Sequence, residues 1–283
     1  MIRIITDSAA DYTVEQAKNN NIEVVDLSIS FNETEYYSNQ DDASFSNFYN
    51  ILSKSSVLPK TSQPAPGAYV SLFEQAKANN DDVLVICLSG GLSGTYQSAI
   101  MAKEIVEYSN IHVVDSRQAI MAQRLIVDYA VKLRDEGNSI NHIIEKLEYI
   151  KDKIVVFGIV ETLKYLHLGG RLSKSAMIVG ELLTVKPIIT LKDGAVIMES
   201  KKRGSKNAMN YIQNKLVDLG YDNEYPVYFG YSANKERGQE FMNKTVEKYQ
   251  IKEYKGTFGI GGTIGAHVGP NGIALAFVVK EKM

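Results

Sequence analysis

Short apolar runs alternate with helical patterns along the first half of the chain. Phe45, Phe48, Tyr49 and Leu52, for example, have the spacing of one helix face. Strands that alternate with helices predict a parallel sheet covered by helices on both faces. We therefore expect an N-terminal three-layer α/β/α domain. Its predicted strands are residues 3–6, 22–27, 83–88 and 111–114. Helices are expected at residues 68–79, 119–136 and 139–150. A further helix begins near residue 13, and another follows the glycine-rich turn and ends near residue 108.

The second half has a different pattern, in which a hairpin is mixed with helices. Two apolar runs, residues 188–191 and 195–200, are joined by Asp193-Gly194, which is typical of a β-hairpin. This mixture predicts an α+β domain with a mostly antiparallel sheet and helices, so the fold class is α/β with two domains, 1–152 and 153–283. The other predicted strands are 154–160, 227–231, 252–257 and 273–280, and the predicted helices are 163–168, 177–184, 205–219 and 235–249.

Three segments fall outside these patterns. Residues 33–42 are polar and are expected to form a loop. Residues 60–67, KTSQPAPG, hold two prolines and a glycine, which exclude a helix or an inner strand and indicate an ordered loop. Residues 259–272 are rich in glycine, which permits close backbone approach or a positive φ.

Small polar side chains follow the predicted strands of the first half, namely Asp7, Ser8, Ser89, Asp115 and Ser116. Ligands of open parallel sheets bind outside the carboxyl ends of the strands. The sequence therefore predicts a ligand site along this edge of the sheet.

The stretch LSGGLSGTYQSA, residues 88–99, provides the central part of that edge. A strand, a glycine-rich turn and a helix start present free N–H groups and hydroxyls to an anion. We expect Ser93, Gly94 and Thr95 to supply them. No lysine follows the glycines as in a nucleotide-binding loop, so a monoanion fits better than a polyphosphate, although a phosphate-binding module is one alternative.

A serine esterase or thioesterase is a second alternative, with Ser93 as the nucleophile. Ser93, Asp115 and His267 occur in the chain order of a hydrolase triad, and the turn resembles the nucleophile elbow G-x-S-x-G. Thr95, however, stands where that elbow has its second glycine.

Hydroxyls and histidines extend the candidate site. Thr61 and Ser62 lie in the proline-rich loop, where they either close their own turn or bind the same anion. His267 is either a hydrogen-bonded core residue or a donor to a carboxylate. The other histidines have no metal-ligand spacing, so neither a metal nor another cofactor is expected.

Charge and composition narrow the class of partner. The chain has 283 residues and a net charge of −2, which argues against nucleic acid. Residues 1–152 carry 12 basic and 21 acidic side chains, whereas 153–283 carry 19 and 12. Either the two surfaces simply differ, or the basic half docks an acidic protein or briefly contacts an anionic membrane surface. One cysteine, no signal peptide and no long apolar run predict a cytoplasmic protein.

Two further groups of residues have two interpretations each. The basic run Lys201-Lys202-Arg203 is either a solvated loop or a docking site. Apolar residues near the domain boundary form either the core or the lining of a lipid tunnel, namely Ile159, Leu163, Leu166, Ile178 and Leu182.

Several motifs in one order resemble the DegV family, from the first strand almost to the last. They are TDSAAD at 6–11, TSQP at 61–64, LSGTYQSA at 92–99, VDS at 114–116, LKYLHLGGR at 163–171, LLTVKPI at 182–188 and GAHVGP at 265–270. Two positions depart from the family pattern. Gly90 stands where a second serine is common, and Asn271 where glycine is usual.

The resemblance implies a protein that holds one long-chain fatty acid between two domains. It further implies the binding subunit of a bacterial fatty acid kinase, which does no chemistry alone and presents the carboxylate to a separate ATP-binding subunit for acyl-phosphate formation. By the same resemblance, Thr61, Ser62, Ser93 and His267 surround the carboxylate. Arg171 and the basic segment with Lys202 and Arg203 are expected to dock the kinase subunit.

Overall fold

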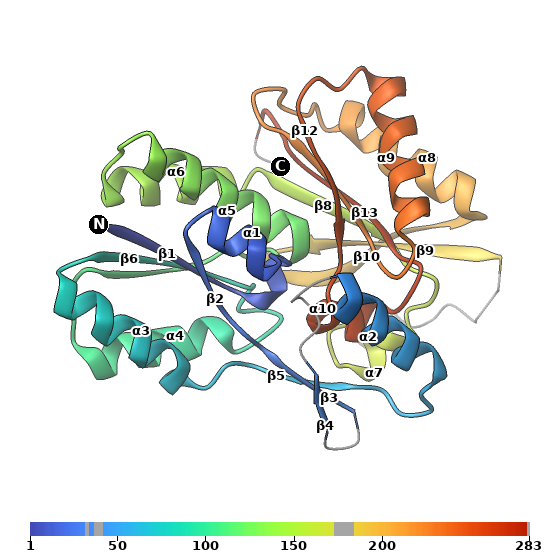
Figure 1. Cartoon of the computed structure of the whole chain (residues 1–283). Coiled ribbons are helices and arrows are strands. Elements are labelled where there is room, and N and C mark those ends of the chain that lie inside the picture. Colours follow the sequence, from blue (N-terminus) through green and yellow to red (C-terminus); the bar gives the residue numbers. More distant parts are fainter. Residues whose placement is uncertain (32–33, 37–41, 173–183, 282–283) are drawn as a thin grey trace.

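The computed structural model describes residues 1–31, 34–36, 42–172 and 184–281. Two main sheets and one small sheet are connected by helices (Figure 1). The fold class predicted from the sequence is confirmed, with a parallel sheet first and a mostly antiparallel sheet second. The proposed boundary at residue 152 falls between a helix and a strand and stays a prediction, because one helix packs on both main sheets.

The first sheet is parallel and has the strand order β2-β1-β6-β7. Helices α3 and α4 pack on one face through a core that includes Tyr69, Phe73 and Ala99. Helices α1 and α5 cover the other face, which completes the three layers (Figure 1). The bounds are β1 Ile2–Asp7, β2 Ile22–Val25, β6 Asp82–Cys87, β7 Ile111–Asp115, α1 Val14–Asn19, α3 Pro66–Asn79, α4 Thr95–Val106, α5 Ile120–Asp135 and α6 Ile140–Lys151, with a 3-10 turn at Ser8–Ala10.

The second sheet has the order β10-β9-β8-β13-β11-β12, and only the β11–β12 pair is parallel. Helices α8 and α9 cover its outer face through Ile212, Leu216 and Phe241. The bounds are β8 Ile154–Ile159, β9 Val185–Lys192, β10 Ala195–Arg203, α8 Ser205–Asp218, β11 Val227–Tyr231, α9 Lys235–Tyr249, β12 Tyr254–Gly259 and β13 Ile273–Val278.

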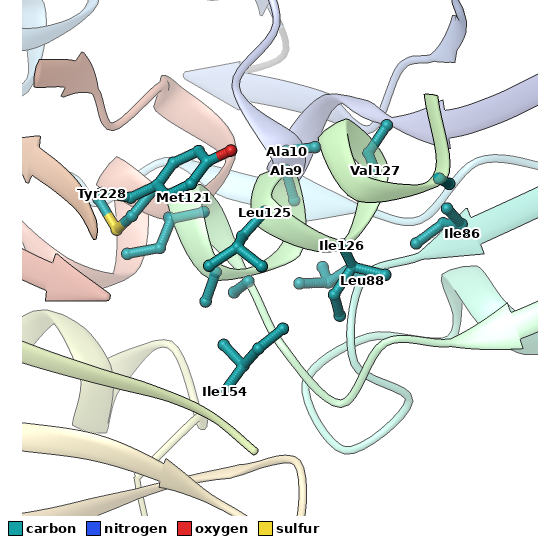
Figure 2. Packing of buried hydrophobic residues seen from close by; sticks show 14 of the residues in the cluster. Ala9, Ala10, Ile86, Leu88, Met121, Leu125, Ile126, Val127, Ile154 and Tyr228 are labelled. Atoms are coloured by element: carbon teal, nitrogen blue, oxygen red, sulfur yellow. The ribbon is translucent and has the colours of Figure 1, made fainter. Parts of the chain in front are cut away.

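Helix α5 lies between the two main sheets, and its residues belong to the core that both share. In Figure 2, Ile126 points toward Leu88 after β6, while Met121 lies beside Tyr228 of β11. A helix that packs on two sheets must be apolar nearly all round, and most of its residues from Ile120 to Val131 are buried.

The small sheet and one helix were not predicted. The sheet has the order β4-β3-β5, and β4 lies within the segment expected to be a loop. Strand β5 lies in the proline-rich segment, which tolerates a strand because β5 is at the sheet edge and ends before Pro64. Helix α10 lies in the glycine-rich segment. The bounds are β3 Ser28–Phe31, β4 Thr34–Tyr36, α2 Asp42–Lys54, β5 Lys60–Ser62, α7 Lys164–Leu168 and α10 Gly262–Val268.

Candidate functional site

A cavity of about 780 Å³, including its mouth, lies between the two halves of the chain. The second main sheet, the small sheet, the loop after β6 and helices α5, α7 and α10 contribute to its wall. The wall is mostly apolar, as is usual for sites that bind small molecules. Its apolar residues are Leu27, Leu88, Leu92, Ala119, Ile120, Val156, Leu166, Ile189, Leu191, Val196, Ile264 and Val268, and its polar side chains are Thr61, Ser62, Gln63, Ser93, Arg171, Thr190, Thr263 and His267.

Thr61 and His267 form a hydrogen-bonded pair in this wall, although 206 positions separate them in the chain. Thr61 Oγ1 on β5 lies 2.9 Å from Nε2 of His267 on α10. Burial, together with the positive charge of Arg171, lowers the pKa of His267 to about 4. The imidazole is therefore neutral near pH 7, with one N–H that can donate and one ring nitrogen that can accept.

Gly169 makes room for the imidazole. A Cβ at residue 169 would overlap Nδ1 of His267, so no larger residue fits without displacing the ring. That Nδ1 is buried and has no hydrogen-bond partner among the described residues. Gly169 therefore serves the packing of His267 as well as the end of α7.

Ser93 lies on the loop between β6 and α4 and reaches the cavity wall. Its Oγ lies 2.9 Å from Oγ1 of Thr95, the first residue of α4, and Gly94 is the N-cap. The loop passes close to the proline-rich segment, because a Cβ on Gly94 would overlap the amide of Gln63. Gly94 and Thr95 thus lie beside Ser93, while the cavity wall itself includes Ser93 alone of the three.

Arg171 connects this loop to α7. Its Nε donates to the carbonyl oxygen of Leu92 at 3.0 Å, and its Nη1 donates to that of Gly169 at 2.7 Å. The guanidinium also lines the cavity, so this predicted docking residue lies next to the head-group candidates. Lys202 instead covers the ring of Tyr211, and Arg203 is exposed at the end of β10.

The predicted tail residues are distributed differently. Leu166 lines the cavity, and Leu163 packs against the small cluster that contains it. Ile159 does not line the cavity, because successive residues of a strand face opposite sides and Ile159 shares the α8 side with Phe157. Ile178 and Leu182 lie outside the described residues, as do residues 177–183 of the predicted helix that contains them.

The hydrolase triad is not assembled. Ser93 hydrogen-bonds to Thr95 and His267 to Thr61. Asp115 Oδ1 accepts the backbone N–H groups of Gly90 and Arg117 at 3.1 and 2.9 Å. The described geometry therefore supplies no base for a serine nucleophile.

The two departures from the family pattern have structural explanations. A Cβ on Gly90 would lie 3.0 Å from Oδ2 of Asp115, so a side chain there would face that carboxylate. Gly90 does not line the cavity. Asn271 has a φ of 61°, a conformation that asparagine tolerates nearly as well as the usual glycine. The turn that follows His267 is therefore retained.

The TDSAAD motif positions α10, a role that the prediction of Asp7 and Ser8 at the sheet edge did not include. Oδ1 of Asp11 accepts the N–H of Gly261 at 2.9 Å, just before α10 begins. Ser8 Oγ lies 3.3 Å from Oγ1 of Thr263, which lines the cavity. Cavity residues such as Ile120 and Leu191 were not predicted from the sequence, because apolar side chains of the same kind also form the core.

A family model described as "Uncharacterised protein, DegV family" matches residues 1–280. The chain belongs to the DegV family. A DegV domain-containing protein of Staphylococcus aureus strain N315 is 32% identical over 286 residues, covering 99% of this chain and 98% of that protein. The family recognised from the motifs is therefore confirmed over the whole chain.

Solved structures show the same DegV fold. A stearic acid-binding protein from Eubacterium ventriosum is 29% identical, covers 99% of each chain and has a TM-score of 0.89. DegV of Bacillus subtilis, described as a fatty acid-binding protein, is 29% identical, covers 99% of each chain and has a TM-score of 0.85.

The described part of the chain holds neither a candidate metal cluster nor a helix suited to span a membrane. Within the described ranges, no group of three or more His, Cys, Asp or Glu side chains could hold a metal ion. Among the helices described, none is both long and apolar enough to cross a bilayer.

Proposed function

We propose that this DegV protein binds one long-chain fatty acid in the cavity between its two halves. The observation that carries the proposal is an apolar cavity with a cluster of neutral donors in its wall. Two relatives with the same fold, each 29% identical, are described as fatty acid-binding proteins, and one of them binds stearic acid. The carboxylate is held by Thr61, Ser62, Ser93 and His267, with Gly94 and Thr95 adding donors at the start of α4.

The acyl tail supplies most of the affinity. Burying about 14 methylenes contributes on the order of 11 kcal/mol before the cost of ordering. A hydrogen bond to a carboxylate adds only about 1.5–3 kcal/mol. The hydroxyls therefore fix the position of the head group and prevent an unpaired buried charge.

His267, Thr61 and the carboxylate form a short chain of hydrogen bonds. With its proton on Nε2, neutral His267 donates to Thr61 Oγ1, which leaves the Thr61 hydroxyl proton for the carboxylate. The guanidinium of Arg171, which lines the same cavity, offsets the negative charge of the head group.

The protein acts as a carrier and presents the carboxylate to a separate kinase subunit, which forms the acyl phosphate from ATP in the cytoplasm. The basic second half, with 19 basic and 12 acidic side chains, favours an acidic partner. Arg203 at the exposed end of β10, with Lys202 and Arg171, forms the proposed docking surface. The same basic half is suited to brief contact with an anionic membrane during ligand uptake.

Mass spectrometry of solvent extracts from the purified protein tests the binding proposal. We expect a long-chain fatty acid, or uptake of added hexadecanoate to one molecule per chain. Ser93→Ala should weaken hexadecanoate binding about tenfold, since one hydrogen bond to a charged group is lost. Ser109→Ala, on an exposed connection, is the matched control and should bind as the wild type does.

A protein that carries no fatty acid and takes none up would contradict the binding proposal. Formation of acyl phosphate by a fatty acid kinase subunit tests presentation separately. Ser93→Ala should reduce that rate more than it reduces binding, and unchanged phosphorylation would exclude the proposed role of Ser93. Acylation of Ser93 with turnover of a model ester by the protein alone would favour the esterase instead.

A further inference from the structure

Ser89 connects the loop after β6 to the second half of the chain. The sequence places Ser89 among the polar residues of the ligand edge, but the structure buries it fully and it does not line the cavity. Its Oγ donates to the carbonyl oxygen of Gly194 at 2.7 Å and accepts the N–H of Gly91 at 3.2 Å. Gly194 lies in the turn between β9 and β10, 105 positions away in the chain. The Ser89 hydroxyl therefore holds the tip of that hairpin against the loop.

Glycines on both sides allow this close contact. A Cβ on Gly194 would lie 2.6 Å from Oγ of Ser89, and a Cβ on Gly91 would lie 2.7 Å from the carbonyl oxygen of Gly194. Gly194 also has a φ of 78°, in the left-handed region that glycine adopts readily. The hairpin tip thus packs on the backbone of the glycine-rich loop, with no space for a side chain between them.

The backbone of Ser89 holds the segment that leads to Ser93. The carbonyl oxygen of Ser89 accepts the N–H groups of Leu92 at 3.0 Å and Ser93 at 3.2 Å. Its own N–H donates to the carbonyl oxygen of Gln118 at 2.9 Å, before α5 begins. The second half contacts the same segment again, because Nε of Arg171 donates to the carbonyl oxygen of Leu92 at 3.0 Å. A displacement of Ser89 therefore displaces Ser93.

We propose that Ser89 is a positioning residue that fixes the Ser93 hydroxyl at the head-group site through its bond to Gly194. This inference rests on the proposed binding of a fatty acid carboxylate at Ser93. Because Ser89 does not line the cavity, it acts on the carboxylate only by way of the loop. Loss of its hydroxyl leaves the Gly194 carbonyl and the Gly91 N–H without this partner, so the loop and the hairpin move apart. The bond from Ser93 to the carboxylate then weakens, since hydrogen bonds depend steeply on distance and angle.

Binding of hexadecanoate and of 1-hexadecanol, which has the same tail without the charge, tests this role. Ser89→Ala should weaken hexadecanoate binding about tenfold, as expected for Ser93→Ala, and hexadecanol binding less than about threefold, since bonds to neutral groups are weaker. In the Ser93→Ala protein, Ser89→Ala should weaken hexadecanoate binding less than about twofold further, because the hydroxyl that it positions is gone. Equal losses for acid and alcohol, or losses that multiply in the double variant, would overturn the inference.

Thr245→Val is the matched control for a lost buried hydroxyl. Oγ1 of Thr245 donates to the carbonyl oxygen of Phe241 at 2.6 Å and accepts Nε2 of Gln213 at 2.8 Å, on α9 and outside the cavity. Thr245→Val should bind both compounds as the wild type does. A loss of hexadecanoate binding as large as that of Ser89→Ala would assign the effect to general destabilisation and overturn the inference.

Gly194→Ala perturbs the same contact from the other half and decides the inference if Ser89→Ala does not fold. It should also weaken hexadecanoate binding about tenfold and hexadecanol binding less than about threefold. Gly137→Ala is its control, because Gly137 has a similar φ of 82° but a Cβ there would meet nothing within 4 Å. Equal hexadecanoate binding by the two glycine variants would overturn the inference. Failure of the wild type to bind hexadecanoate would instead contradict the proposed function itself.

Discussion

The buried imidazole of His267 should make part of the folding free energy depend on pH. Burial lowers its pKa in the folded protein to about 4, compared with 6.5 for an unperturbed histidine. The unfolded chain therefore binds more protons between pH 4 and 6.5, so stability is lost as pH falls through that range. The difference of about 2.5 pKa units corresponds to about 3 kcal/mol.

Asp7 changes the stability with pH in the opposite direction. The contribution of His267 therefore cannot be measured on the wild type alone. Burial raises the pKa of Asp7 from 3.8 to about 6, even though its carboxylate accepts N–H groups of Ala9 and Leu88. The folded state then binds more protons between pH 3.8 and 6, so stability is lost as pH rises through that range. This contribution is also about 3 kcal/mol, with the opposite sign.

A difference measurement separates the two groups. Urea unfolding of wild type and His267→Gln should be compared at several pH values from 4 to 7.5. Glutamine keeps a donor for Thr61 but does not titrate, and Asp7 is common to both proteins. The wild type should therefore lose about 3 kcal/mol relative to the variant between pH 7.5 and pH 4.

His142→Gln is the control, because the side chain of His142 is 43% exposed on α6. The difference in unfolding free energy between His142→Gln and the wild type should change little over the same pH range. A difference between wild type and His267→Gln that is constant with pH would refute the idea that burial keeps His267 neutral.

Two further substitutions test packing at the site and between the sheets. Gly169→Ala should displace the His267 ring and weaken fatty acid binding about tenfold, the equivalent of one lost hydrogen bond of about 1.5 kcal/mol, and unchanged affinity in calorimetry would contradict it. Tyr228→Phe removes a 2.7 Å hydrogen bond to Asp128 and should lower the unfolding free energy by about 1.5–3 kcal/mol. Tyr254→Phe, on a side chain that is 43% exposed, should change it by less than about 0.5 kcal/mol, and equal effects would exclude the buried bond as the cause.

Most long elements could be predicted because their periodicity reflects which face is buried. Strand β6 is a continuous apolar run since helices cover both faces of its sheet, and α6 carries its apolar residues on one side. The small sheet could not be predicted, because strands of three or four residues are too short to show an alternation. Helix α10 was missed since four of its residues and caps are glycines, which disfavour helices locally, and tertiary contacts to α2 and α7 stabilise it.

The head-group cluster was easier to predict than the tail wall. Thr61, Ser93 and His267 could be named because they lie in motifs that resemble the family pattern, and the structure brings Thr61 to His267. The wall depends on which face each apolar residue takes. Alternation along β8 assigns Val156 to the cavity and Ile159 to the opposite core, but the sequence does not say which face meets the cavity.

The two halves of the site need a fixed relative position. Polar side chains on α5 contribute to it by contacting both halves. The guanidinium carbon of Arg124 lies 3.9 Å from the ring centre of Tyr12 and 4.2 Å from that of Phe258, so one cation bridges both halves. Asp128 accepts hydrogen bonds from Tyr12 and Tyr228, again one residue from each half.

Apolar packing alone would tolerate sliding between α5 and the sheets, since cores accept many similar arrangements. The buried charges of Arg124 and Asp128 do not tolerate such sliding, because a shift would leave them unpaired at a cost of several kcal/mol. This interface therefore fixes Ser93, from the first half, relative to His267 and Arg171, from the second. In the proposed function, the apolar cavity supplies affinity for the tail, and the buried polar interface keeps the proposed head-group donors of the two halves in a fixed arrangement.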